Sequence, residues 1–352
     1  MNLFLFSPPS SPQRRMIYAG YSPDIIHGLD QGFIFAPFGL DCEIFTIPAD
    51  LSAPSSEIPS DEVLMQWIEA NDRAYYATHA EYAVSTPQSI HEQLVADTIS
   101  YLRTLEHDHG SHTKIIASRI ERTQTRKSMP QLFGSLAEAY PDACIFLFST
   151  PLSGTWIGAS PELLLQADAS QLTTMSLAGT RLATDTTEYA PAEAWDDKNI
   201  AEQRIVTDFL IRTLSDKGLA PCPSPLMSRR AGSVEHLCTI IHAPLSQELS
   251  TAQRTGLIHA LSPTPALSGY PRREAVDFIN AHESAPRRFY GGMVGISTPA
   301  RLECYVNLRS AQKGSAQGGL TMYAGGGITT LSDPTAEWHE TCRKLSTLTK
   351  SL

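Results

Sequence analysis

The sequence has 352 residues, of which 42% are hydrophobic and 18% charged, so it can bury a large core as one big domain or two ordinary ones. Its formal net charge of -10 and the lack of a Lys/Arg run argue against a nucleic-acid-binding surface. No apolar run is long enough to cross a membrane, and the six cysteines are scattered without a C-x-x-C pair. We therefore expect neither a disulfide framework nor a zinc site, and a location in the cytoplasm.

The N-terminal part predicts short strands and no chemistry. The apolar run at 2–6 lacks a basic flank, so it predicts a first strand and not a signal peptide. Strands separated by Pro and Gly turns continue to about residue 47. Residues 48–60 are rich in Pro and Ser and predict a surface loop.

Two ionisable residues of the middle region stand next to apolar strands. A helix is predicted at 89–106 and a strand at 114–120, in which Lys114 shares one face with every second residue. Alone, Lys114 would be read as a surface lysine. Glu162 directly precedes an apolar run, where burial would raise the pKa of its carboxyl group and make it a possible proton donor.

A further carboxylate lies on a predicted core-facing stripe. Residues 196–214 predict a helix that places Glu202 on the same side as apolar residues, where a carboxylate needs a partner or a cation. Beyond it we expect a strand at 234–242, a helix at about 252–260 and another after Pro271. Segments 289–297 and 302–311 predict a hairpin with Arg309 inside its strand pattern.

The last 33 residues predict a glycine-rich strand end followed by a charged helix. Consecutive glycines at 325–327 let the backbone approach a ligand closely. In the helix after Pro334, Glu337, Glu340 and Lys344 share one face, which could bind a metal and an anion together. A solvated acid–base face is the commoner explanation of such a pattern. The opposite stripe is apolar and consists of Trp338, Cys342, Leu345 and Leu348.

Seven short motifs, in this order, resemble those of the chorismate-utilising enzymes. They are ASPELLL at 159–165, LAGTR at 177–181, PTPALSG at 263–269, GGMVG at 291–295, NLR at 307–309, AGGGI at 324–328 and EWHET at 337–341. The resemblance covers about residues 110–350. It implies an α+β fold of two large, orthogonally packed antiparallel sheets with helices outside. Residues 1–352 would then form a single domain, with 1–109 as its divergent N-terminal part.

The resemblance also implies a role for each candidate residue. Glu202 and Glu340 match magnesium ligands, with Glu337 nearby, and Mg²⁺ is the implied cofactor. Lys114 matches the base that activates water, and Glu162 the acid. The implied substrate-binding residues are Gly179, Thr180, His236, Arg309, Gly325 and Lys344. One departure concerns the flanks of Glu202, which read Ala and Gln where relatives often have histidine.

Within the family, the motifs are most similar to those of isochorismate synthases, which convert chorismate to isochorismate by adding water at ring C2 and losing the C4 hydroxyl. Ala178 stands where aminodeoxychorismate synthases generally have a nucleophilic lysine. Salicylate synthase, the anthranilate synthase large subunit and a non-catalytic chorismate-binding protein are the alternatives. We expect chorismate as the small-molecule partner, no glutamine amidotransferase, no nucleic acid, no membrane, and a monomer or weak dimer. Whether the product serves menaquinone or siderophore biosynthesis is not predicted.

Overall fold

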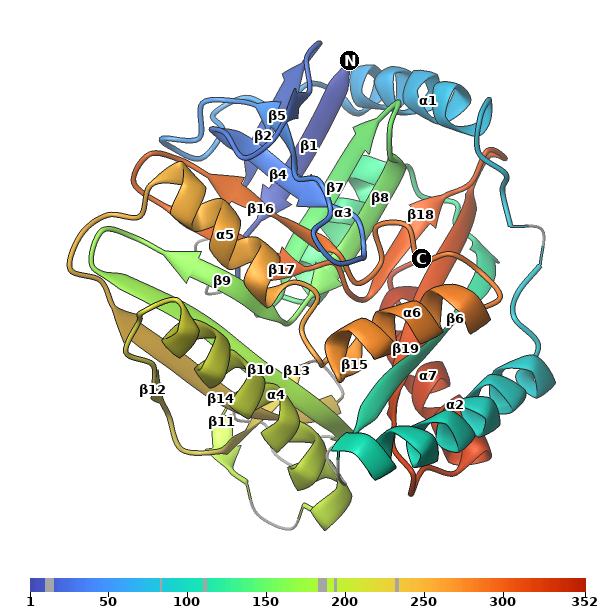
Figure 1. Cartoon of the computed structure of the whole chain (residues 1–352). Helices are drawn as coiled ribbons and strands as arrows, with labels where there is room; N and C mark the ends of the chain where they lie inside the picture. The colour runs from blue at the N-terminus through green and yellow to red at the C-terminus, as the bar shows by residue number, and fades with distance from the viewer. Residues whose placement is uncertain (10–15, 83, 110–112, 183–188, 193–194, 232–233) are drawn as a thin grey trace.

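The computed structural model describes residues 1–9, 16–82, 84–109, 113–182, 189–192, 195–231 and 234–352. Over these residues the chain forms two antiparallel sheets, one of eight strands and one of eleven, with helices on their outer faces (Figure 1). The strands of one sheet cross those of the other in this view, as expected when two twisted sheets pack orthogonally. The expected α+β architecture is therefore confirmed.

The eight-stranded sheet is built from segments at both ends of the chain and from its middle. Its strands, in spatial order, are β15 (Gly269–Tyr270), β6 (Lys114–Gln124), β19 (Gly319–Ile328), β18 (Ser310–Lys313), β8 (Gly154–Ser160), β7 (Cys144–Thr150), β1 (Asn2–Ser7) and β2 (Tyr18–Ser22). The predicted first strand is thus β1, and its six residues are all buried.

The eleven-stranded sheet contains most of the remaining strands. In spatial order they are β11 (Tyr189–Pro191), β13 (Met227–Ala231), β14 (Val234–Pro244), β10 (Gln171–Leu182), β9 (Leu163–Ala167), β17 (Leu302–Val306), β16 (Met293–Ser297), β4 (Gly32–Ala36), β5 (Phe45–Pro48) and β3 (Ile26–His27), and β12 (Cys222–Pro223) pairs with β14. Residues 49–60 carry no helix or strand, as the Pro/Ser-rich stretch predicted.

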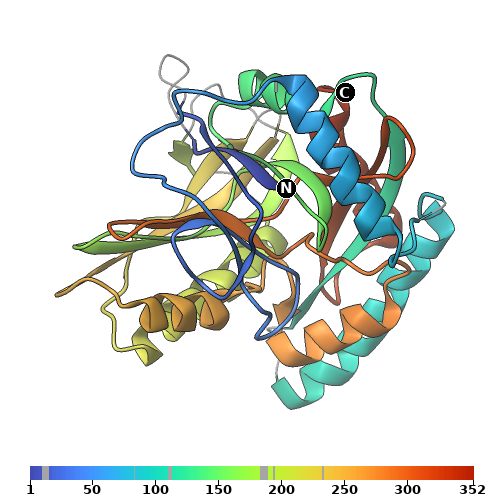
Figure 2. The ribbon, with the colours of Figure 1, turned by 90° about the horizontal axis from the view of Figure 1, so that it is seen from above.

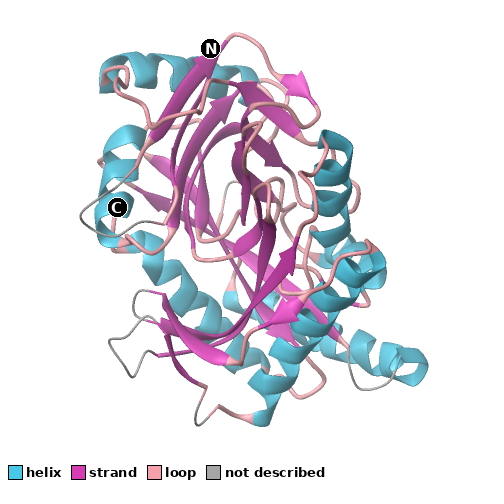
Figure 3. Cartoon of the chain, turned by 90° about the vertical axis from the view of Figure 1, so that its left-hand side faces the viewer, coloured by secondary structure: helices cyan, strands magenta, loops and turns pink. Residues whose placement is uncertain are grey.

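Helices cover the outer face of each sheet (Figures 2 and 3). Against the eight-stranded sheet lie α1 (Asp61–Tyr76), α2 (Gln88–His109), α3 (Met129–Ala139), α6 (Arg272–His282) and α7 (Pro334–Thr349). Against the eleven-stranded sheet lie α4 (Asp197–Asp216) and α5 (Thr251–Leu261). Local sequence sets several helix starts: Asp333 accepts a hydrogen bond from the Ala336 amide, and Pro334 occupies the first helical turn of α7.

Aromatic side chains fill the space between the two sheets. Phe33 and Phe35 of β4 contact Phe4 of β1 and Phe148 of β7, with ring centroids 4.9 Å apart for Phe4–Phe33 and for Phe35–Phe148. All four are at most 1% exposed. Each such burial stabilises the fold by about 2–3 kcal/mol relative to exposure, so these contacts hold the two sheets together.

One predicted element is wrong. Segment 302–311 was expected to be one strand, but β17 ends at Val306 in the eleven-stranded sheet and β18 begins at Ser310 in the eight-stranded sheet. Arg309 lies in the connection with a φ of 46°. Side chains alternate between the two faces of the strand on both sides of such a corner. A sequence pattern with a period of two therefore does not reveal the change of sheet.

Candidate active site

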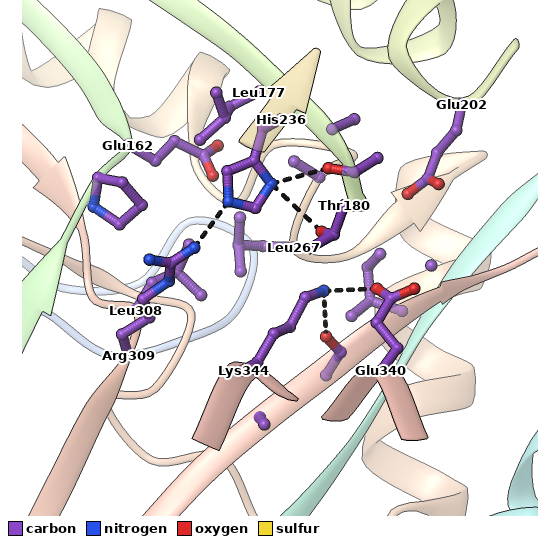
Figure 4. Close-up of a pocket in the computed structure, with 18 of the residues that line it drawn as sticks. Glu162, Leu177, Thr180, Glu202, His236, Leu267, Leu308, Arg309, Glu340 and Lys344 are labelled. Carbon is purple, nitrogen blue, oxygen red and sulfur yellow. Dashed lines mark hydrogen bonds and ion pairs between the residues drawn. The ribbon is translucent and has the colours of Figure 1, made fainter. Parts of the chain in front are cut away.

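A single pocket brings together ten of the eleven predicted site residues. They are Lys114, Glu162, Gly179, Thr180, Glu202, His236, Arg309, Gly325, Glu340 and Lys344. The eleventh, Glu337, lies just behind this lining and is 2% exposed. Figure 4 shows the labelled side chains gathered around a common space. They come from β10 and β14 of the eleven-stranded sheet, from connections between elements, and from α4 and α7.

Glu162 and Arg309 lie at two neighbouring corners where the chain changes sheet. Glu162 stands between β8 and β9, and Arg309 between β17 and β18. The corners are joined by backbone hydrogen bonds, from the Val306 amide to the Glu162 carbonyl at 3.1 Å and from the Ala159 amide to the Arg309 carbonyl at 3.2 Å. At these corners, where regular pairing is interrupted, both side chains turn into the pocket (Figure 4).

The floor of the pocket is the end of β19. The pairing of β18 with β19 reaches only Met322, whereas β6 pairs with β19 as far as Ile328. The glycines beyond Met322 therefore have one strand edge without a strand partner. Lys344 of α7 donates to the Gly325 carbonyl at 2.8 Å on this stretch. Since the N–H and C=O of one strand residue point to the same side, the Gly325 amide is directed there too.

Each glutamate of the predicted magnesium site forms an ion pair with a lysine. The Nζ of Lys114 lies 2.7 Å from Glu202 Oε1, that of Lys344 lies 2.8 Å from Glu340 Oε1, and that of Lys198 lies 2.8 Å from Glu337 Oε1. Lys198 was not among the predicted residues. Burial and the adjacent Glu340 carboxylate raise the pKa of Glu337, which is the response expected of acids crowded around a cation site.

Two glycines of β19 make room for these carboxylates. A Cβ on Gly327 would lie 2.2 Å from Glu202 Oε1 and 2.9 Å from Lys114 Cε. A Cβ on Gly326 would lie 2.9 Å from Glu337 Oε2 and 3.7 Å from Glu340 Oε1. Any side chain at either position would fill the space that the acids face. The lack of a side chain at these two positions thus leaves space for the carboxylates, in addition to the backbone freedom that glycine gives.

The acidic residues fit a hard divalent cation. Glu337 Oε2 is buried and has no hydrogen-bond partner, and it faces the same glycine as Glu340 Oε1. Among the described residues, no group of three or more His, Cys, Asp and Glu side chains is arranged to hold a metal ion by itself. Mg²⁺ keeps several waters and uses one or two carboxylates together with groups of the substrate, so two of these glutamates would be enough.

Glu162 is a buried acid. It is 3% exposed, and burial raises the pKa of its carboxyl group to about 8, against the opposing effect of Lys114, Lys344 and Arg309. Its Oε1 has no hydrogen-bond partner. The carboxyl group is therefore protonated at neutral pH and can donate a proton into the pocket.

Lys114 is fully buried at the start of β6. Its ammonium makes the ion pair with Glu202 but has no well-aligned hydrogen bond to any described side chain or backbone group. Lys114 and Ile116 both line the pocket, which confirms the face that the period-two pattern predicted.

His236 is held as a neutral ring between two partners. Burial, and next the nearby Arg309, lower its pKa well below the usual value. Nδ1 lies 2.7 Å from the Gly179 carbonyl and so carries the proton, while Nε2 accepts a hydrogen bond of 2.7 Å from Arg309 Nη2. Thr180 Oγ1 lies 3.2 Å from Nδ1. Burial lowers the pKa of Arg309 to about 10, so its guanidinium remains charged at neutral pH.

Several lining residues were missed by sequence reasoning. Tyr290 and Tyr323 stack with ring centroids 5.2 Å apart, and both line the pocket with the apolar Leu177, Leu267 and Leu308. Apolar residues of this kind carry no chemical signal in a sequence, since they look like any core position.

The predicted apolar stripe of α7 is wrong at Cys342, which is exposed. Glu337 and Thr341 occupy the buried side of the helix instead.

Two crossed antiparallel sheets around a pocket of paired acids and bases define a small-molecule-binding domain, and comparison with known proteins identifies its family. The family model for chorismate binding enzymes matches residues 56–352. The protein therefore belongs to the chorismate-binding enzyme family, as its motifs predicted.

Curated relatives and a solved structure agree with this assignment. The chain is 30% identical over 268 residues to the salicylate biosynthesis isochorismate synthase of Pseudomonas aeruginosa, covering 74% of this chain and 54% of the relative. It is 29% identical over 269 residues to anthranilate synthase component 1 of Aeropyrum pernix, covering 74% and 59%. The chain thus spans less than two thirds of the length of these relatives.

The fold is shared with a putative 2,3-dihydroxybenzoate-specific isochorismate synthase, DhbC, from Bacillus anthracis. The TM-score is 0.74 at 22% sequence identity, and the match covers 99% of this chain and 96% of that one. No helix among the described residues is long and apolar enough to span a membrane.

Proposed function

We propose that the protein is an isochorismate synthase, an isomerase that adds water at ring C2 of chorismate while the C4 hydroxyl leaves. The observation that carries this proposal is Glu162, a buried carboxyl group whose pKa is raised to about 8 and which shares its pocket with the amine of Lys114. A protonated acid and a lysine are the two proton-transfer groups that this reaction needs.

In the proposed reaction, Lys114 takes a proton from water as its oxygen bonds to C2. The ring double bonds shift, and the bond from C4 to its hydroxyl breaks as Glu162 donates a proton to the departing oxygen. One water enters and one leaves, so substrate and product are isomers. Lys114 must be neutral when it accepts the proton, and Glu162 must be neutral when it donates.

The cationic side chains suit the two carboxylates of chorismate. Arg309 and the Gly325 amide would hold the enolpyruvyl carboxylate, and Lys344 adds positive charge beside them. Gly179 and Thr180 would face the ring carboxylate. His236 would keep Arg309 in place, since its neutral Nε2 accepts from that guanidinium. The leucines and tyrosines of the lining would exclude bulk water from the ring.

Mg²⁺ is the proposed cofactor, held by Glu202 and Glu340, with Glu337 close enough to act through water. When bound, it supplies positive charge that stabilises the ring carboxylate during the reaction. The residues of this chain would position the substrate around it.

The test is an assay with chorismate and Mg²⁺ but without ammonia, in water labelled with heavy oxygen. Chorismate and isochorismate have the same mass, so chromatography separates them and the label reports the incoming oxygen. We expect one solvent oxygen in the product. Unlabelled isochorismate, or no isochorismate at all, would contradict the proposal.

The same assay distinguishes the alternatives. Salicylate, detected by its fluorescence, would indicate that pyruvate elimination follows. Activity only with ammonia would indicate an anthranilate-forming enzyme, which Ala178 at the pocket wall does not exclude. Chorismate binding without turnover would indicate a non-catalytic protein. A cytoplasmic location, independence from an amidotransferase and a monomeric or weakly dimeric state remain predictions.

A further inference from the structure

Lys198 joins the two helices that carry the proposed metal ligands. It lies one turn before Glu202 on α4, and Glu337 lies one turn before Glu340 on α7. The Lys198 ammonium donates to Glu337 Oε1 at 2.8 Å. The helices cover different sheets, so this bond ties their first turns together directly beside the cation site.

The bond also fixes which oxygen of Glu337 faces the site. Ser332 Oγ donates to the same Oε1 at 2.7 Å, so this oxygen has two donors. Oε2 has none and points to Gly326, which Glu340 Oε1 also approaches. Leaving a buried carboxylate oxygen without a donor is costly unless a cation or its bound water occupies that position.

We propose that Lys198 is a positioning residue of the cation site: it holds Glu337 by one oxygen so that the other is presented to the metal or its water. The inference rests on the proposed function in so far as it takes the cation to be divalent. Lys198 is absent from the pocket lining, so it acts through Glu337 and not on the substrate. Outer-shell partners of this kind typically change metal affinity by about 10- to 100-fold.

A competing role makes the opposite prediction. If Lys198 only placed positive charge near the site, removing it would strengthen the binding of a divalent cation. Geometry favours positioning, because the ammonium contacts Oε1 of Glu337, whereas Oε2 is the oxygen that approaches Gly326 beside Glu340 Oε1.

The experiment measures Mn²⁺ binding to the full chain without chorismate, using the electron paramagnetic resonance signal of free Mn²⁺. We expect Lys198→Met to weaken binding by about 10- to 100-fold and Lys198→Arg to recover part of the loss. Ser332→Ala should weaken binding less. Lys217→Met is the matched control, because this exposed lysine ends the same helix and its loss changes the net charge equally. Circular dichroism and thermal melting verify that each variant is folded.

Glu337→Gln tests whether Lys198 acts through Glu337. In the Glu337→Gln background, Lys198→Met should cause no further loss of Mn²⁺ affinity. Unchanged or tighter Mn²⁺ binding by Lys198→Met, or an equal loss in the Glu337→Gln background, would overturn the proposal. So would a wild-type protein that binds no Mn²⁺. The proposed reaction is judged separately by the labelled-water assay, so that either conclusion can fail without the other.

Discussion

The Lys114 ammonium lies 2.7 Å from Glu202 Oε1, so the proposed base and a proposed magnesium ligand form an ion pair. Lys114 is 0% exposed and Glu202 is 9% exposed. Removing either partner therefore leaves the other as a buried group without its counter-charge, and the design of variants has to take this into account.

The first prediction concerns the metal ligands. Glu202→Gln and Glu340→Gln keep the side-chain volume but remove an anionic oxygen from the cation site, and turnover should be abolished at micromolar Mg²⁺. Glu202→Ala should also be inactive, and both Glu202 variants should lower the unfolding midpoint because the buried Lys114 loses its counter-charge. Activity at increasing Mg²⁺ and urea unfolding measure the two effects. Wild-type turnover by either Gln variant at micromolar Mg²⁺ would show that the assigned ligand is wrong.

The second prediction concerns the acid and the base. Lys114→Ala and Glu162→Gln should each lower kcat by about a hundredfold to ten-thousandfold, with a smaller effect on KM, because each group acts mainly in the transition state. The reaction is reversible in the family, so both variants should be impaired from chorismate and from isochorismate. Retention of more than about a tenth of the wild-type rate is a smaller loss than general acid–base catalysis normally gives.

The third prediction concerns pH. Burial raises the pKa of Glu162 to about 8, and the forward reaction needs the protonated form, so kcat should fall as pH rises through about 8. The folded-state pKa lies above the ordinary value of 4.5, so the native state holds a proton that the unfolded chain loses. Stability should therefore decrease as pH rises from about 4.5 to about 8. Glu162→Gln should remove this decrease, which urea unfolding across the pH range can measure. An identical pH dependence in the variant would contradict the assignment.

The fourth prediction concerns the glycines. Gly327→Ala should strongly reduce activity, because its Cβ would lie 2.2 Å from Glu202 Oε1, and Gly326→Ala should weaken metal binding through Glu337. Gly134→Ala in α3 and Gly256→Ala in α5 are controls, since no atom lies within 4 Å of the added Cβ. The controls should keep full activity and gain about 0.4–1 kcal/mol of stability. Full activity in Gly327→Ala would show that glycine is not required beside Glu202, and unchanged metal binding in Gly326→Ala would show the same beside Glu337.

The fifth prediction concerns Ala178, which lines the pocket. Ala178→Lys should not improve water addition, because its amine would project toward the substrate and compete with water at ring C2. Product analysis by mass spectrometry would detect an aminated product or a trapped adduct. Undiminished isochorismate formation would indicate that residue 178 does not face the substrate.

Local chemistry made many elements predictable. The C-terminal helix begins as expected because Asp333 caps it and Pro334 suits its first turn. The buried strand β1 follows from an apolar run too short for a membrane. The resemblance to the chorismate-utilising enzymes implied that Glu162, Glu202 and Glu340 share one pocket, and the structure brings them together although they lie far apart in the chain.

Features that depend on contacts between residues far apart in the sequence were not predictable in this way. The strand pattern around Arg309 gave no sign that the chain changes sheet there, because the flanking strands pair with segments on either side of Glu162 that lie far away in the sequence. Lys198 was missed since its partner is 139 residues away. Cys342 was assigned to the buried stripe of α7, and only the packing of that helix shows that it is exposed.

The sequence by itself determined the family through its seven short motifs, because these depend on side-chain chemistry at fixed spacing. The resemblance to that family in turn implied the sheet-rich architecture and the polar residues of the pocket. Only the tertiary structure decided which charges from different elements are neighbours: Lys114 with Glu202, and Lys198 with Glu337. It also decided that Glu162 is buried enough to stay protonated. The physical reason is that a pKa and an ion pair depend on distance and desolvation, which arise when segments from two sheets and two helices meet.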